Sequence, residues 1–97
     1  MAVPIVVVIR FKGDSQDLLA RFETARQRWI ETQDGDYERP TFHAVCKTED
    51  GIAVVNGWES AVAHRAFGEG IAPHIAAVGM EGPDHIEHMR VERLGWD

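Results

Sequence analysis

The sequence has a single cysteine, few basic residues and no long apolar run. Cys46 alone cannot form an internal disulfide or a cysteine-based zinc site, and we expect it to be a small core residue in a reducing compartment. Lys and Arg number 10 against 16 Asp and Glu, which gives a formal net charge of −6 and disfavours binding to nucleic-acid phosphates. No segment approaches the roughly 20 apolar residues of a membrane-spanning helix. We therefore expect no nucleic acid and no membrane among the partners.

The length and composition are those of one small globular domain. The 97 residues suit a single hydrophobic core, so we interpret residues 1–97 as one domain. The apolar run at residues 2–9 lacks the basic leader and small-residue cleavage site of a signal peptide. We interpret this run as part of the fold, and we expect a cytoplasmic protein.

The first half of the sequence predicts a strand and then a helix. Residues 4–11 are β-branched and apolar at successive positions, which is typical of a strand that is buried on both faces. Apolar residues then recur at three- and four-residue spacing over residues 16–32, which predicts an amphipathic helix. Asp14 and Ser15 are the candidate caps of this helix.

The second half predicts a hairpin, a helix and a last strand. Residues 41–47 and 52–58 are strand-like, and the Asp-Gly pair between them favours a tight turn. A second helix over residues 60–78 is expected to break near residues 70–73, because glycine and proline both disfavour its continuation. Residues 85–94 alternate well enough to form the final strand.

This order of elements, βαββαβ, predicts an α+β ferredoxin-like fold with two helices on one face of a four-stranded antiparallel sheet. Both faces of the first and third strands are apolar, and two helices cover only one face. An uncovered apolar face usually marks an interface, so we predict a homodimer through the sheet face. The alternative is that residues 94–97, which include Trp96, fold back over that face.

Two segments carry a family resemblance. The stretch Val-Val-Asn-Gly-Trp-Glu-Ser at residues 54–60, followed by Ala-His-Arg-Ala-Phe at residues 63–67 and Pro73-His74, resembles the dimeric α/β-barrel superfamily and its antibiotic-biosynthesis-monooxygenase-like branch. The resemblance implies a ferredoxin-like dimer. It also implies one of several activities, among them cofactor-independent oxygenation of phenolic or anthrone-type polyketides, quinol oxidation and haem degradation.

The chain departs from the patterns of the characterised activities. The polyketide oxygenases have an Asn and a Tyr where this sequence has Val54 and His64. Asn56 shares the strand face of Val54 and could reach a pocket by another route. The haem-degrading members have an Asn on the first strand and a Trp in the second helix, where this chain has Val7 and Phe67. We therefore do not expect haem degradation.

The candidate catalytic residues are His64 and His74, because an imidazole titrates near neutral pH and can act as a general base. A solvated surface position is the alternative for His64, and His74 follows the proline at the expected helix break. The candidate substrate-binding residues are Trp58, Asn56, His43 and Phe67. For Trp58 and His43, a structural role in the core or at an interface is the competing interpretation.

No metal or cofactor is expected. His85 and His88 lie three apart on a predicted strand, so they point to opposite faces and cannot form a metal-binding pair. Two functions remain open. One is a cofactor-independent monooxygenase acting on an aromatic or polyketide-type small molecule, and the other is a non-catalytic dimer that binds a small hydrophobic ligand or serves a structural or stress-associated role. An enclosed cavity with converging polar groups would favour catalysis or ligand binding over a purely structural role.

Overall fold

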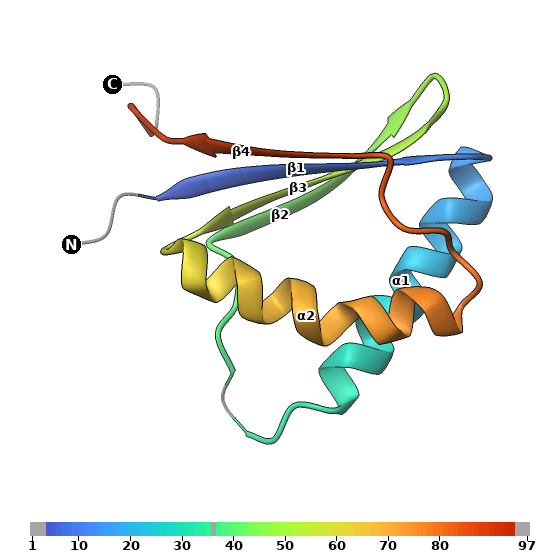
Figure 1. Ribbon diagram of the computed structural model, residues 1–97, viewed down its shortest axis with the longest axis horizontal. Helices are drawn as coiled ribbons and strands as arrows, with labels where there is room; N and C mark the ends of the chain where they lie inside the picture. Colours follow the sequence, from blue (N-terminus) through green and yellow to red (C-terminus); the bar gives the residue numbers. More distant parts are fainter. Residues whose placement is uncertain (1–3, 36, 95–97) are drawn as a thin grey trace.

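The computed structural model describes residues 4–35 and 37–94 and shows the expected βαββαβ order (Figure 1). The elements are β1 (Ile5–Lys12), α1 (Ser15–Glu31), β2 (Phe42–Thr48), β3 (Gly51–Trp58), α2 (Ala61–Ala77) and β4 (His85–Arg90). Each lies within a few residues of its prediction, and the largest difference is β4, which ends four residues earlier than expected.

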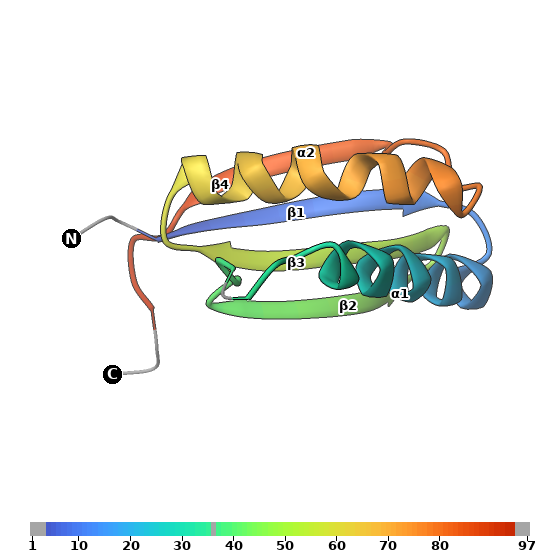
Figure 2. The same ribbon diagram turned by 90° about the horizontal axis from the view of Figure 1, so that it is seen from below.

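The four strands form one antiparallel sheet in the order β2-β3-β1-β4. Both helices lie on the same side of this sheet (Figures 1 and 2). In Figure 2, α1 lies in front of the β2–β3 half and α2 in front of the β1–β4 half. The ferredoxin-like fold predicted from the sequence is therefore confirmed.

The register decides which side chains face the helices. Val7 on β1 lies opposite Asn56 on β3 and His88 on β4, and Asn56 also lies opposite His43 on β2. Directly opposite residues in a sheet share a face. His43, Asn56, Val7 and His88 therefore form one row across the helix-covered face.

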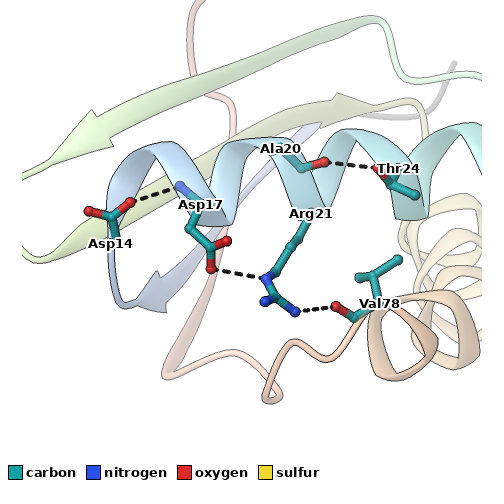
Figure 3. A network of polar contacts seen from close by, with 6 residues as sticks. All are labelled: Asp14, Asp17, Ala20, Arg21, Thr24 and Val78. Atoms are coloured by element: carbon teal, nitrogen blue, oxygen red, sulfur yellow. Dashed lines mark hydrogen bonds and ion pairs between the residues drawn. The ribbon is translucent and has the colours of Figure 1, made fainter.

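Helix α1 begins where the sequence predicts. The Asp14 carboxylate accepts a hydrogen bond of 2.9 Å from the Asp17 backbone N–H, so Asp14 is the N-cap (Figure 3). Asp17 in turn accepts from Arg21 Nε at 2.9 Å, and Arg21 Nη1 donates to the Val78 carbonyl at 2.6 Å. Because Val78 is the C-cap of α2, Arg21 ties the two helices together at this end.

The expected break in α2 is wrong, since the helix runs without interruption from Ala61 to Ala77 with Pro73 inside it. Proline removes one backbone donor and leaves the carbonyl four residues earlier without its partner. That carbonyl belongs to Glu69, an exposed residue at which water can take over the hydrogen bond. Gly70 serves packing instead, because a Cβ at this position would lie 2.6 Å from Trp29 Nε1 on α1.

The hydrophobic core lies between the sheet and the helices. Its most deeply buried large side chains are Trp58, Ile52, Val7 and Val54, and Asn56 is buried among them. On the outer face of the sheet Val6 and Val8 are half-buried, while Phe42 and Met89 are exposed.

Cys46 is exposed, so the expectation that it is a core residue is wrong. It lies opposite Ala53 in the register, which places it on the outer face of β2, an edge strand. Trp96, which the sequence offered as a cover for this face, lies outside the described residues.

Candidate functional site

A cavity of about 770 Å³ lies between α2 and the β1–β4 half of the sheet, and we call it the larger cavity to distinguish it from a smaller one beside α1. Most of its walls are apolar, with Ile9 and Phe11 from β1, Ile86 from β4, and Phe67, Ile71 and Ile75 from α2. The polar and charged side chains in the lining are His64, Arg65, Glu69 and His88. All six residues of β4 are exposed, Ile86 and His88 among them, so the cavity is open to solvent along this strand.

His64 and His88 meet at one end of this cavity. His64 lies in the first turn of α2, and His88 lies on the helix-facing side of β4 because it is opposite Val7. The two rings are 5.1 Å apart between centroids and nearly perpendicular, at 81°. The structure thus brings the predicted His64 together with His88, a residue for which the sequence predicted no role.

The signal for His88 is present in the sequence. Alternation along β4 places Ile86 and His88 on one face and His85 on the other, as the register shows. The sequence does not show that β4 pairs with β1 beside α2. This pairing is what brings His88 next to His64.

Burial lowers the pKa of His64 below its ordinary value, and its electrostatic interaction with His88 lowers the pKa further. Its Nε2 is enclosed and has no hydrogen-bond partner among residues 4–35 and 37–94. An imidazolium would need acceptors for both of its N–H groups, so this environment favours the neutral ring. At neutral pH, His64 is therefore an unprotonated base in the wall of an apolar cavity.

Trp58 supports this end of the site without lining the cavity. Its side chain is 1% exposed, and its ring lies 6.0 Å from that of His64 and 5.2 Å from that of Phe67. Its Nε1 is buried and has no hydrogen-bond partner in the described part of the chain. Trp58 therefore packs behind the cavity wall, against His64 and Phe67.

Asn56 and His43 line a different, smaller cavity of about 310 Å³ on the α1 side of the fold. His43 Nδ1 and Asn56 Oδ1 are 2.5 Å apart, and the His43 ring stacks on Phe22 at 6.2 Å. Asn56 therefore lines the smaller cavity and not the cavity that His64 lines. Phe67 lines both cavities and lies between them.

His74 lines neither of these two cavities. It is ten residues after His64 on the same helix, which at 100° per residue leaves their directions about 80° apart.

Within residues 4–35 and 37–94, no three His, Cys, Asp or Glu residues lie close enough to hold a metal ion. None of the helices in this part of the chain has the length and apolar character of a membrane span.

No protein-family model and no curated protein matches the chain. Solved structures do match. A putative antibiotic biosynthesis monooxygenase from Chloroflexus aurantiacus J-10-fl superposes with a TM-score of 0.61 at 14% identity, over 95% of this chain and 97% of that one. A monooxygenase from the gene ActVA-Orf6 of Streptomyces coelicolor, in complex with nanaomycin D, superposes with a TM-score of 0.54 at 23% identity, over 99% and 93%. The chain therefore shares the ferredoxin-like fold of these two solved structures.

Proposed function

We propose that the larger cavity binds a small aromatic molecule, that His64 removes a proton from it, and that the resulting carbanion reacts with molecular oxygen without a cofactor. The observation that carries the proposal is the pair of His64 and His88, whose rings are 5.1 Å apart, in the wall of an otherwise mostly apolar cavity of about 770 Å³. The lowered pKa of His64 favours its unprotonated form. This volume lies within the roughly 300–1,000 Å³ typical of small-molecule sites. The structural neighbours add support, because they are described as monooxygenases.

The cavity suits deprotonation of an acidic carbon. Proton transfer creates an imidazolium beside a substrate anion, and these opposite charges attract each other more strongly against apolar walls than in bulk water. The attraction offsets the burial that lowers the pKa of His64. His88, whose ring is 5.1 Å away, is placed to donate a hydrogen bond to the anion.

The reaction balances without an added reductant. A methylene carbon attached to an aromatic ring loses one proton to His64, and the carbanion forms a bond to one atom of O2. The peroxide anion takes the proton back from the His64 imidazolium, and the hydroperoxide then loses water as its O–O bond and the remaining C–H bond break. The products are a carbonyl group and one molecule of water.

The test uses 1,8-dihydroxyanthrone as the probe, with absorbance and oxygen consumption corrected for spontaneous oxidation. General base catalysis contributes about 10²–10⁴-fold, so we expect His64→Ala to lose at least about 100-fold of the turnover. His74→Ala is the matched control on the same helix, and we expect little change because His74 lies outside the cavity. Undiminished turnover in His64→Ala would refute the proposal.

The second candidate function is a dimer that binds a hydrophobic ligand without turnover. The half-buried Val6 and Val8 and the exposed Phe42 and Met89 on the outer sheet face favour a second copy there. We expect light scattering to give a dimer mass and Val8→Glu to give a monomer. Leu19→Glu, which changes an exposed apolar residue on α1, should leave the mass unchanged. Saturable binding of the anthrone without oxygen consumption would favour this function over catalysis.

A further inference from the structure

The smaller cavity has the features of a second binding site, separate from the cavity of His64. Four parts of the fold build it: α1, the segment that precedes β2, the β2–β3 hairpin and α2. Its lining residues are Arg26, Trp29, Ile30, Tyr37, Arg39, Pro40, His43, Asn56 and Phe67. Its volume of about 310 Å³ lies at the lower end of the roughly 300–1,000 Å³ of small-molecule sites, which suits a ligand with a single ring.

Asn56 supplies an unused polar group in this lining. The residue is 0% exposed, its Oδ1 is 2.5 Å from His43 Nδ1, and its Nδ2 has no partner within residues 4–35 and 37–94. Exchanging the oxygen and nitrogen of the amide would still leave one of the two atoms unpaired, because His43 engages only one of them. Buried polar groups are almost always hydrogen-bonded, and an unpaired one costs about 1–3 kcal/mol. A ligand oxygen that accepts from Nδ2 would remove this cost.

The charge of the lining indicates an anion. The cavity has two arginines and no Asp or Glu in its walls, although the whole chain carries a formal charge of −6. Arg26 forms an exposed ion pair of 3.7 Å with Glu23, which lies outside the lining. The Arg39 guanidinium lies 4.8 Å from the centre of the Tyr37 ring, at the edge of the cavity.

Three of the remaining lining residues are aromatic, namely Trp29, Tyr37 and Phe67. Trp29 meets Tyr37 at 5.2 Å and Phe67 at 5.0 Å, both edge to face. These contacts hold the indole in place between its neighbours. Because these rings are already fixed, a planar ligand can pack on their apolar surface with little loss of side-chain entropy.

We propose that the smaller cavity binds a single-ring aromatic carboxylate. One of its oxygens accepts a hydrogen bond from Asn56 Nδ2, and its negative charge is held by Arg26 and Arg39. Its ring packs on Trp29 and Tyr37. The site is independent of deprotonation at His64, since the two cavities share Phe67 but no polar residue.

The test is a titration of the ¹⁵N-labelled full chain with salicylate, followed by NMR at the side-chain amide and indole signals. We expect saturable shifts at the Asn56 amide and the Trp29 indole, with binding retained in His64→Ala. Arg39→Gln should weaken binding about tenfold through loss of a charge-assisted contact. Arg28→Gln is the matched control, because it removes the same charge from an exposed position outside the lining, and it should change affinity less than about twofold.

Three outcomes would overturn the proposal. The first is the absence of shifts at Asn56 and Trp29 up to ~10 mM salicylate, which corresponds to an affinity too weak for a built site. The second is an equal effect of Arg39→Gln and Arg28→Gln, which would reduce the interaction to overall charge. The third is binding of the neutral salicylamide as tight as that of salicylate, which would remove the role of the anion.

Discussion

Replacing Gly70 with alanine tests how closely the two helices approach each other. Alanine is the better helix former, so helix propensity alone predicts a gain of about 0.5–1 kcal/mol in the free energy of unfolding. The structure predicts the opposite sign. The added Cβ would lie 2.6 Å from Trp29 Nε1, and the indole cannot easily move because Phe67 and Tyr37 pack against it.

Gly68 provides a matched control two residues earlier on the same helix. A Cβ at position 68 would meet nothing within 4 Å, so Gly68→Ala should show the propensity gain alone. Overpacking in a well-packed contact costs about 1–3 kcal/mol. The propensity term cancels between the two variants, and Gly70→Ala should therefore be less stable than Gly68→Ala by about 1–3 kcal/mol.

The assay is thermal and urea denaturation of both variants beside the wild type. In a chain of 97 residues, 1 kcal/mol shifts Tm by about 4–8 °C, so we expect Gly70→Ala to melt at least about 4 °C below Gly68→Ala. The urea slopes should agree, because the fold does not change. Equal increases in Tm for the two variants would refute the close approach of α2 to Trp29.

Two further predictions concern charge. The pKa of His64 is lowered in the folded state, while in the unfolded chain it is near 6.5, so the unfolded state binds more protons and stability falls as pH falls from about 6.5 through the folded pKa. The urea midpoint should therefore drop less between pH 7.5 and pH 5 in His64→Gln than in the wild type or in His85→Gln, and an unchanged pH dependence would contradict the burial of His64. Arg21→Ala removes the 2.6 Å hydrogen bond to the Val78 carbonyl and should cost about 1 kcal/mol in urea denaturation, whereas Arg28→Ala on the same helix should cost less than half of this; equal costs would show that the tie between the helices contributes nothing.

Most of the fold could be predicted from the sequence because its signals are local. The β-branched run of β1, the three- and four-residue spacing of α1 and the Asp-Gly turn each act within one element. The shared face of Asn56 and Trp58 also follows from strand alternation, and the register confirms it. The break expected near Pro73 does not occur. Local preference disfavours proline inside a helix, but packing along the whole length of α2 keeps that helix continuous.

The candidate site was harder to predict because it depends on which elements become neighbours. His64 could be named from its chemistry, but His88 becomes its neighbour only through the pairing of β4 with β1. His43 and Asn56 are also joined by register, and they belong to a cavity on the other side of Phe67 from His64. No spacing along the chain indicates that one phenylalanine separates two cavities.

The sheet order has a consequence for how a ligand enters and leaves. β4 is an edge strand that pairs only with β1, and all six of its residues are exposed, yet Ile86 and His88 form one wall of the larger cavity. Backbone segments with few buried contacts open locally at a lower free energy than the rest of a fold. By this criterion, β4 is expected to open locally at a lower free energy than the central strands β1 and β3, and such opening would give a ligand of the larger cavity a way in and out past Ile86 and His88.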